Sequence, residues 1–376
     1  MRVIHVIKAV GIAGAEQHLL TLLPGLRSCG VDARLILLFD PKRPVSEYAA
    51  AMEAKGVPVE PLPIRHHADL TVLTRLMSRF RQQTPDAVHT HLIHADLYGI
   101  MAARLSGVRA ILTSRHNDDA FRYRRPVRMV NAALWRGVQA GIGISEAITR
   151  FSITVEGAPA ERMHTIHYGV DVSPPPLERG AARRALIQEL GLPDSARLVG
   201  MACRLVEQKG VSYAIDAFGQ IAAEFPDAHL LIAGEGRLRT ALESQAREAQ
   251  LAERIHFLGW RGNIPAYMAT LDVLLVPSLW EGFGLVLLEA MAQQTPIIAS
   301  GVSAIPEIVI DGETGRLVPA RDAVALAEAL RGLLADGAYR QHLGLVGRDR
   351  LETTFNADTM VRRTLELYQK LLYPNP

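Results

Sequence analysis

Residues 272–300, DVLLVPSLWEGFGLVLLEAMAQQTPIIAS, decide the fold of this chain. The short aliphatic runs at 272–278 and 296–300 have the length and composition of buried strands. Between them, Gly282 and Gly284 favour a turn, and the apolar segment that follows predicts a helix starting near Gly284. A strand, a helix and a second buried strand in this order predict two parallel strands joined by a crossover helix.

The same alternation runs through most of the chain. Strand-like runs occur at 3–10, 33–39, 86–91, 109–114, 140–145, 197–204, 228–234 and 254–259. Helical patterns lie between them, for example at 15–28, 70–83 and 94–105, and a last helix is expected over 356–372 with Asn356 or Asp358 as its cap. Such alternation predicts an α/β fold with parallel strands and helices on both faces.

The alternation breaks at VDVSPPPLERG, residues 170–180, where three consecutive prolines exclude a helix or a central strand. We interpret this segment as a linker between two Rossmann-like, doubly wound domains that face each other across a deep cleft. The first domain spans 1–172 and the second 173–355, and the C-terminal helix at about 356–376 packs back on the first. Ligands of such sheets bind beyond the carboxyl ends of the strands, so the loops at these ends should carry the chemistry.

Composition narrows the functional classes. A net charge of +2 over 376 residues argues against a nucleic-acid binder. Two cysteines, Cys29 and Cys203, indicate no disulfide framework. Residues 1–17 show no signal-peptide pattern, and no window of about 18 apolar residues could span a bilayer. We therefore expect a cytoplasmic protein. Any contact with a membrane would be peripheral, on the inner face of that membrane.

Two loops have features of phosphate sites. In MACRLVEQKG, residues 201–210, Arg204 and Lys209 follow a buried strand, where they are either a clamp for a diphosphate or two solvated loop cations. In VGIAGAEQHLL, residues 10–20, Gly11 and Gly14 end a strand and open a helix. That loop either exposes backbone N–H groups to an anion or is a plain tight turn.

Glu281 and Glu289 stand among residues that otherwise look like core. Buried carboxylates are unfavourable unless something polar meets them. A nucleotide sugar would meet both: its ribose hydroxyls would contact Glu289 and its sugar hydroxyls Glu281. Its diphosphate would then contact the two cations and the amides at the start of the helix, residues 283–285.

These motifs resemble those of glycosyltransferase family 4, the retaining transferases with the GT-B fold. PSLWEGFGLVLLEAMA is similar to the family's glutamate-x7-glutamate signature, GIAGAEQHL to its glycine loop and CRLVEQKG to its R-x4-K diphosphate clamp. IAGEG, FLGW, IPEIV and DGETGRLVP resemble its flanking signatures, so the resemblance covers essentially the whole chain. It implies transfer of a sugar from a nucleotide-sugar donor to a hydroxyl of a sugar or lipid-linked acceptor, in polysaccharide, lipopolysaccharide or glycolipid assembly.

The resemblance also implies roles for residues. The catalytic positions are His116, Arg204, Lys209 and Glu281. The donor-binding positions are Gly14, Gly234, Trp260, Arg261, Phe283, Gly284, Leu285 and Glu289. The chain departs from the family at His167 and Tyr168, where proline–asparagine–glycine is common, and at Gln294, Ser303 and Ala304, where glycines are usual. The sequence leaves the sugar, the base and the acceptor open.

The sequence also bears on a possible metal site, on an arginine-rich surface and on rival functions. Asp118 and Asp119 are adjacent and no D-x-D occurs, so we expect no metal and no cofactor. His89 and His91 share one face of a strand, which leaves a zinc site as an alternative. Arg122, Arg124, Arg125 and Arg128 are either a solvated helix entrance or a patch for anionic lipid or a phosphate-bearing acceptor. The rival functions are a sugar-nucleotide epimerase of the same fold and a non-catalytic nucleotide-sugar-binding protein.

Overall fold

The computed structural model describes residues 1–9, 11, 14–43, 45–65, 69–172 and 176–374. The chain divides into two compact units. Unit 1 comprises Met1–Asp171 together with Phe355–Pro376, and unit 2 comprises Val172–Thr354. Within the part of the chain that the structure describes, no helix combines the length and the apolar character that a membrane crossing requires.

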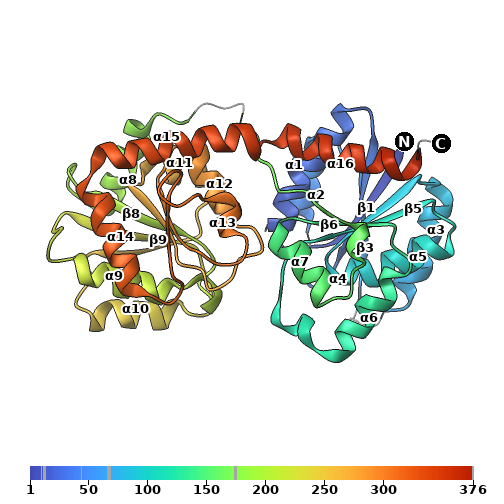
Figure 1. Cartoon of the computed structure of the whole chain (residues 1–376), viewed down its shortest axis with the longest axis horizontal. Coiled ribbons are helices and arrows are strands. Elements are labelled where there is room, and N and C mark those ends of the chain that lie inside the picture. The colour runs from blue at the N-terminus through green and yellow to red at the C-terminus, as the bar shows by residue number, and fades with distance from the viewer. Residues whose placement is uncertain (10, 12–13, 44, 66–68, 173–175, 375–376) are drawn as a thin grey trace. The chain divides into compact units, whose positions relative to one another are not determined.

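Unit 1 is built on a seven-stranded parallel sheet in the order β3-β2-β1-β4-β5-β6-β7 (Figure 1). Its strands are β1 Arg2–Lys8, β2 Asp32–Phe39, β3 Val59–Pro63, β4 Ala87–His91, β5 Ala110–Arg115, β6 Ala140–Gly143 and β7 Met163–Thr165. Its helices are α1 Gly14–Ser28, α2 Ser46–Ala54, α3 Thr71–Gln83, α4 Leu92–Ala95, α5 Met101–Leu105, α6 Arg125–Trp135, α7 Glu146–Thr154 and α16 Ala357–Leu372. Shorter helical turns are η1 Asp96–Ile100, η2 Ala120–Tyr123 and η3 Ala160–Arg162.

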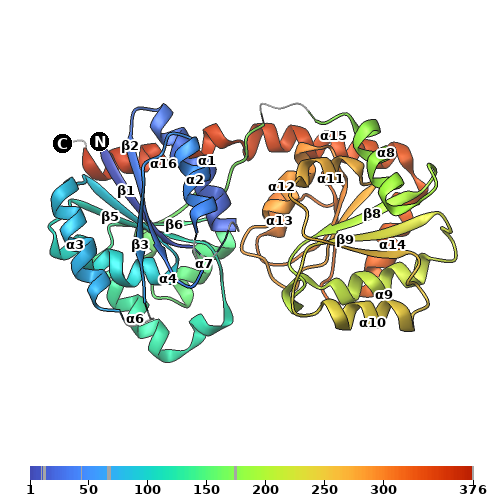
Figure 2. The same ribbon diagram turned by 180° about the vertical axis from the view of Figure 1, so that it is seen from behind.

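Helices cover both faces of this sheet because its strands are apolar on both faces. Along β1, Val3 and Ile7 belong to the core shared with α1, α2 and α16. Ile4 and Val6 belong to the opposite core, shared with α3, α5 and α6 (Figure 2). Successive side chains of a strand point to opposite faces, so β1 contributes to two hydrophobic layers at once.

Unit 2 repeats this architecture with a six-stranded parallel sheet in the order β10-β9-β8-β11-β12-β13. Its strands are β8 Arg197–Ala202, β9 Ala228–Ala233, β10 Ile255–Gly259, β11 Val273–Val276, β12 Ile297–Ser300 and β13 Arg316–Val318. Its helices are α8 Arg179–Leu190, α9 Val211–Ile221, α10 Arg239–Glu248, α11 Ile264–Thr270, α12 Leu285–Ala292, α13 Ile305–Ile308, α14 Ala323–Ala335 and α15 Gly337–Thr354, with a short turn η4 Glu207–Lys209. The quoted stretch forms β11, α12 and β12, as predicted.

Within the described residues, the structure confirms the predicted strands and helices and adds three strands. The additions are β3, β7 and β13. β3 reads VEPLP, and its two prolines are tolerated because it is an edge strand that pairs only with β2. β7 and β13 have three residues each, too few to show a period. The helix predicted over 94–105 is divided into α4, the π-helical turn η1 and α5. Of the predicted linker, residues 173–175 lie outside the described residues, and α8 begins at Arg179.

The last helix, α16, begins at a side-chain cap. Asn356 Oδ1 accepts a hydrogen bond from the backbone N–H of Thr359 at 2.8 Å. The helix then buries Tyr368, Leu367 and Leu372 in the unit 1 core beside α1. The C-terminal segment therefore contributes to the core of the unit that contains the N-terminus.

Replacing the cap should weaken this packing measurably. We expect Asn356→Ala to lower the free energy of unfolding by about 1 kcal/mol, because one helix N–H loses its acceptor. Asn356→Asp retains an acceptor and should stay close to the wild type. Urea unfolding followed by circular dichroism compares the three proteins. Equal stability of the alanine variant and the wild type would show that this cap does not stabilise α16.

Candidate functional site

The predicted donor-binding residues of unit 2 lie at the carboxyl edge of its sheet. Arg204 and Lys209 follow β8, Gly234 follows β9, and Glu281 follows β11, and these three strands are neighbours. Backbone hydrogen bonds join their loops: the N–H of Leu205 donates to Glu235 O at 2.9 Å, and that of Leu279 to Gln208 O at 2.7 Å. The strand order thus gathers residues that are up to 77 positions apart, from 204 to 281, at one edge.

Glycines allow these loops to approach so closely. Gly210 has φ +62°, and a Cβ there would lie 2.0 Å from the carbonyl oxygen of Pro277. Gly234 has φ +130°, and its Cβ would lie 1.9 Å from the carbonyl oxygen of Cys203. Any side chain at either position would clash with backbone atoms. The fold therefore requires a glycine at position 234, whereas the contact of Gly234 with a donor stays a prediction.

Lys209 and Glu281, both predicted to be catalytic, form an ion pair. Lys209 Nζ donates to Glu281 Oε2, and Ser278 Oγ lies 3.4 Å from the same oxygen. Glu281 is 9% exposed, so its charge needs this partner. Gln208 Nε2 donates to Trp280 O at 3.0 Å and ties the two loops together beside the pair.

Arg204 differs from Lys209 in having no partner. Its side chain is exposed, and it forms no hydrogen bond or ion pair with another residue among those described. A guanidinium in this state offers a planar set of donors that suits phosphate oxygens.

Glu289 is the second carboxylate that the sequence places among apolar residues. It lies in the second turn of α12, whose N-cap Gly284 has φ +95°, so the predicted helix start is confirmed. Across the described ranges Glu289 has neither a hydrogen-bond donor nor a cation against it. Some of its surface is exposed, yet the surrounding protein desolvates the carboxyl and raises its pKa to about 7. Glu281 is paired and Glu289 is not, although both stand in apolar surroundings.

Trp260 and Arg261 follow β10. Trp260 is 77% exposed, an unusual state for a tryptophan and one that leaves its ring open to a ligand. Arg261 holds both oxygens of Glu189 on α8, with Nη1–Oε2 at 3.0 Å and Nη2–Oε1 at 2.5 Å. A donor that binds Arg261 must therefore compete with Glu189, a partner that the sequence did not indicate.

In unit 1, His116 lies directly after β5 and is 9% exposed. Its Nε2 is 3.1 Å from His91 Nδ1, and its Nδ1 is hydrogen-bonded to the hydroxyl of Tyr168. Burial lowers the pKa of His116 to about 3, with Arg122 and Arg115 adding to the effect, so the ring is neutral near pH 7. Tyr168, which the sequence marked only as a departure from the family, also stacks on His18 of α1 at 4.2 Å between ring centroids.

The predicted glycine loop is described only in part. Gly14 is the first residue of α1 and is exposed, whereas residues 12 and 13 lie outside the described residues. Its predicted contact with phosphate stays a prediction.

The predicted arginine surface needs one correction. Arg122 is 2% exposed and belongs to the interior, where it forms an ion pair with Glu156 and donates to Asn117 Oδ1 at 3.1 Å. Glu156 also lies 3.1 Å from Arg115 Nε, and Arg115 pairs with Asp96. From the sequence, the arginines of residues 122–128 were interpreted as one surface cluster. The two acids that neutralise the buried arginines, Asp96 and Glu156, are distant along the chain and could not be inferred from it.

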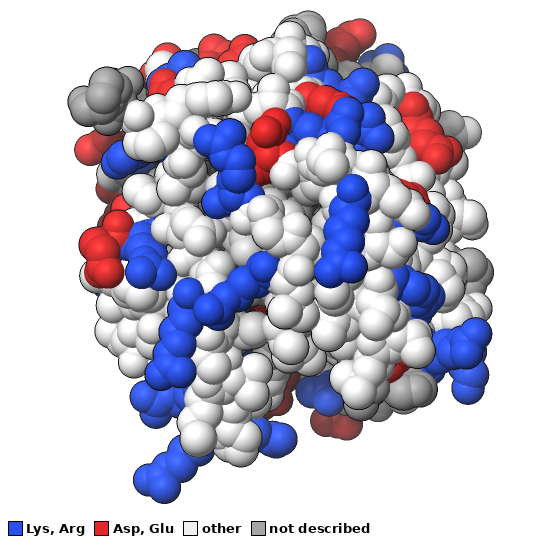
Figure 3. Space-filling model, turned by 90° about the vertical axis from the view of Figure 1, so that its right-hand side faces the viewer, with Lys and Arg blue, Asp and Glu red and all other residues white. Residues whose placement is uncertain are grey.

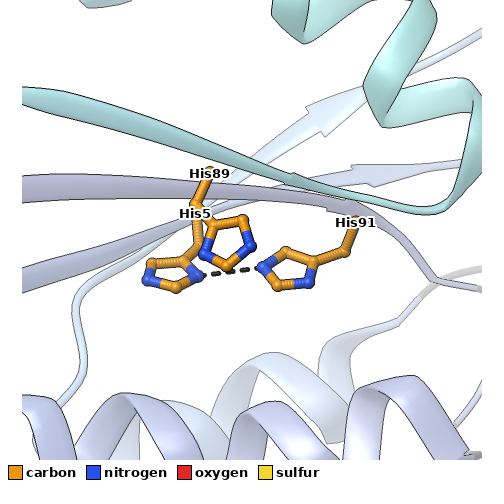
Figure 4. Close-up of side chains that lie close together, drawn as sticks. All are labelled: His5, His89 and His91. Atoms are coloured by element: carbon orange, nitrogen blue, oxygen red, sulfur yellow. Dashed lines mark hydrogen bonds between the residues drawn. The ribbon is translucent and has the colours of Figure 1, made fainter. Parts of the chain in front are cut away.

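Three histidines could in principle hold a metal ion. His5 of β1 and His89 and His91 of β4 have ring nitrogens within 4.8 Å of one another, and Figure 4 shows the rings turned toward each other. The predicted pair therefore gains a third member. His5 pairs directly with His89 across the parallel strands, a register that the sequence does not reveal.

Comparisons with known proteins identify the class. Residues 182–350 match the family model described as Glycosyl transferases group 1, and residues 12–174 match Glycosyltransferase Family 4. The phosphatidyl-myo-inositol mannosyltransferase of Mycobacterium leprae is 30% identical over 342 residues, 89% of this chain and 87% of that protein. The alpha-maltose-1-phosphate synthase of Mycolicibacterium smegmatis is 29% identical, over 81% of this chain and 84% of that protein. The chain therefore belongs to glycosyltransferase family 4 and is a glycosyltransferase.

Solved structures agree on the fold. The Anabaena protein HepE, crystallised with UDP and glucose, superposes with a TM-score of 0.86 at 22% identity, over 98% of this chain and 100% of that one. Sucrose-phosphate synthase from Thermosynechococcus elongatus has a TM-score of 0.83 at 24% identity, and both chains are covered completely. The two Rossmann-like units thus have the GT-B fold, as the sequence predicted.

The raised pKa of Glu289 predicts a pH-dependent stability. The folded carboxyl keeps its proton up to about pH 7, whereas the unfolded carboxyl releases it near its ordinary value of 4.5. The folded state binds more protons between these values, so the free energy of unfolding should fall as pH rises through this window, by about 3 kcal/mol in total. Glu289→Gln removes this term.

Urea unfolding of both proteins at a series of pH values from about 4.5 to 8 tests this linkage. The stability of the wild type relative to Glu289→Gln should decline with rising pH. A difference that is constant over the series would mean that Glu289 is solvated as an ordinary carboxylate.

Proposed function

We propose that this glycosyltransferase uses a nucleotide-sugar donor and transfers the sugar with retention, without a metal ion. The observation that carries the proposal is the edge of the unit 2 sheet, where Arg204, Lys209 and Glu281 follow adjacent strands and α12, which bears Glu289, begins. The relatives support the donor class: HepE was crystallised with UDP and with UDP-glucose. Of the named relatives, one is an alpha-maltose-1-phosphate synthase and one a phosphatidyl-myo-inositol mannosyltransferase, which supports a role in glycan or glycolipid assembly.

In this proposal the donor diphosphate binds Arg204 and Lys209 and the amides of Phe283, Gly284 and Leu285 at the start of α12. Negative charge grows on the diphosphate as the glycosidic bond breaks, and donors fixed at that place stabilise the leaving group most where the charge develops. The cations take the role that a divalent ion has in other transferases. Gly14 and Gly234 bring backbone close to the phosphates, and Trp260 and Arg261 flank the nucleotide.

The two glutamates have different tasks. Glu289 accepts hydrogen bonds from the ribose hydroxyls, which supply the donors that the carboxyl lacks in the free protein. Glu281 pairs with Lys209 until a diphosphate competes for the ammonium group, and its carboxylate then faces the sugar. Positive charge develops on the sugar ring during bond breaking, and a carboxylate lowers the energy of that charge. The departing phosphate accepts the proton of the acceptor hydroxyl as the new glycosidic bond forms on the same face.

His116 is proposed to contact the donor sugar. Both of its ring nitrogens are hydrogen-bonded in the free protein, so its Nδ1–H group would exchange the Tyr168 hydroxyl for a sugar oxygen. Its neutral ring adds no positive charge beside the cationic sugar ring of the transition state. A protonated imidazole would oppose that charge.

The acceptor side of the proposal involves the surface of α6. Arg124, Arg125 and Arg128 are exposed there, next to Tyr123 and Met129, which are 59% and 73% exposed. Figure 3 shows lysine and arginine side chains spread over this side of unit 1, with acidic side chains between them. Arginines attract lipid phosphates, and neighbouring apolar side chains enter the interface. We propose peripheral contact with an anionic membrane that carries a lipid-linked acceptor.

The paired and unpaired glutamates should respond differently to loss of charge. Glu281→Gln should lower turnover roughly 10- to 100-fold, the worth of one charged hydrogen bond, because its charge matters as the bond breaks. The same change frees Lys209, so affinity for the free nucleoside diphosphate should hold or rise. Glu289→Gln should lower that affinity about tenfold through loss of charged hydrogen bonds to the ribose.

Calorimetric titration with nucleoside diphosphates, beside steady-state kinetics in EDTA, distinguishes these effects. Wild-type turnover in EDTA should equal that without chelator, and restoration by magnesium would contradict the metal-free proposal. If both glutamine variants lose affinity for the diphosphate equally, the separate roles are wrong.

The membrane surface predicts charge-dependent binding to vesicles. Each arginine near an anionic surface contributes about 1 kcal/mol. Changing Arg124, Arg125 and Arg128 together to Gln should therefore lower binding to phosphatidylglycerol vesicles more than 100-fold. Cosedimentation measures the partition, with phosphatidylcholine vesicles as the uncharged comparison.

A matched control changes three exposed arginines elsewhere, Arg247, Arg362 and Arg363, to Gln and alters the net charge equally. This control should retain binding. Equal loss in both triple variants would assign the effect to net charge and contradict a specific surface on α6.

A further inference from the structure

A chain of hydrogen bonds crosses the interior of unit 1 from Ser114, near the end of β5, to Tyr168. Its members are Ser114, His89, Tyr368, His5, His91, His116 and Tyr168, and all are buried. The links are Ser114 Oγ–His89 Nε2 (2.7 Å), His89 Nδ1–Tyr368 Oη (2.7 Å), Tyr368 Oη–His5 Nε2 (3.3 Å), His5 Nδ1–His91 Nε2 (3.0 Å), His91 Nδ1–His116 Nε2 (3.1 Å) and His116 Nδ1–Tyr168 Oη. Residues from β1, β4, β5 and α16 thus form one continuous network.

The four imidazoles in this chain are neutral. Burial lowers the pKa of His5 and His116 to about 3 and that of His89 and His91 well below the ordinary value. A neutral imidazole has one N–H donor and one acceptor nitrogen, and which nitrogen holds the proton depends on its neighbours. Each histidine of the chain therefore donates in one direction and accepts from the other.

This limits the chain to two fully bonded arrangements. In one, every link is donated from the Ser114 end toward Tyr168, and in the other every link is donated the opposite way. A change of direction at Tyr368 would leave its hydroxyl proton without an acceptor, at full burial. The direction chosen at one end is therefore transmitted to the other.

Ser114 chooses the direction. The residue is 2% exposed, and His89 is the one hydrogen-bond partner of its hydroxyl in the described parts of the chain. The serine proton must go to His89 Nε2, because the opposite arrangement would leave it buried and unbonded. The hydroxyl proton of Tyr168, at the other end, lies in the field of the Glu16 carboxylate, which adds to burial in raising the pKa of Tyr168. His89 then donates from Nδ1 to Tyr368, Tyr368 donates to His5 Nε2, and His5, His91 and His116 each donate from Nδ1.

We propose that Ser114, His89, Tyr368, His5 and His91 are positioning residues that hold His116 in its Nδ1–H tautomer with its ring fixed. The proposal rests on the function proposed for His116 at the donor sugar. None of the five positioning residues contacts the substrate in this scheme. Tyr368 is the central link, so the C-terminal helix α16 acts on His116 through three hydrogen bonds.

His5, His89 and His91 could also be interpreted as a metal site, but their geometry disfavours that interpretation. Every ring nitrogen of His5, His89 and His91 already has a hydrogen-bond partner, including the His5–His91 contact drawn in Figure 4. Zinc at about 2.0–2.1 Å from three ring nitrogens would draw them closer than their present spread of up to 4.8 Å and break several of these bonds. Metal binding is therefore one outcome of the test, and it would contradict the proposal.

The test is the tautomer of each histidine, read by long-range proton–nitrogen NMR of protein labelled with ¹⁵N-histidine. The wild type should show the Nδ1–H form at His5, His89, His91 and His116. Tyr368→Phe keeps the ring and removes the central link, so His116 should shift toward a mixture of the two tautomers. Ser114→Ala removes the residue that sets the direction and should do the same, whereas Ser114→Thr keeps a hydroxyl and should restore the wild-type spectrum.

Kinetics supply the second readout. Tyr368→Phe and Ser114→Ala should lower kcat about tenfold or more, as a histidine in the wrong tautomer does in other enzymes, with KM for the donor little changed. Tyr48→Phe is the matched control: Tyr48 is buried in the same core and donates to Glu16 O at 3.2 Å, outside the chain. It should change neither the His116 signals nor kcat.

Three results would overturn the proposal. The first is an unchanged His116 tautomer in both Tyr368→Phe and Ser114→Ala, and the second is a changed tautomer with unchanged kcat. The third is binding of one equivalent of zinc that shifts the signals of His5, His89 and His91. Activity of the wild type tests the proposed function separately: absence of transfer from any nucleotide sugar would reject that function whatever the histidine spectra show.

Discussion

Parallel pairing is the constraint on which the rest of this structure depends. Every strand in both sheets pairs in parallel with its neighbours, so all strand carboxyl ends of a unit meet at one edge. Residues far apart in the sequence are thereby brought together without any long-range motif. Lys209 and Glu281 become an ion pair because β8 and β11 are adjacent, and His91 reaches His116 because β4 and β5 are adjacent.

The fold treats its buried polar groups in three ways. Arg115, Arg122, Asp96 and Glu156 keep their charges and neutralise one another, and Thr90 and Thr113 donate further hydrogen bonds to Asp96 at 2.6 Å. The histidines on the other face of the same sheet give up their charge and bond as neutral rings. Among the described residues, Glu289 has neither a cation nor a hydrogen-bond donor beside its carboxyl, and burial raises the pKa of that carboxyl to about 7.

Sequence reasoning recovered what periodicity and glycine punctuation can specify. The alternation of apolar runs gave the strands and helices, and Gly284 gave the start of α12, because both signals are local. It could not give contacts that depend on the return of a distant segment. Tyr368 meets His5 across 363 positions, and Glu156 neutralises Arg122 across 34, so Arg122 looked like a surface residue. The partners of Lys209 and Arg261 were likewise set by strand and helix order rather than by spacing.

The distribution of charge follows the chemistry of a reaction that separates charge. At the unit 2 strand ends, Arg204 has no side-chain partner among the described residues and Lys209 is paired with Glu281, the acid that a diphosphate would replace in the proposed function. At the β5 end of unit 1, burial keeps His116 neutral, and a series of six hydrogen bonds runs from Ser114 through its ring to Tyr168. Each choice has a cost in stability or in buried polar surface that a purely structural core would avoid. The proposed transfer needs fixed positive charge where the leaving diphosphate becomes more negative, and no added positive charge where the sugar becomes cationic. In that proposal, Arg204 supplies the positive charge at the phosphate, and the neutral histidine chain adds none at the sugar.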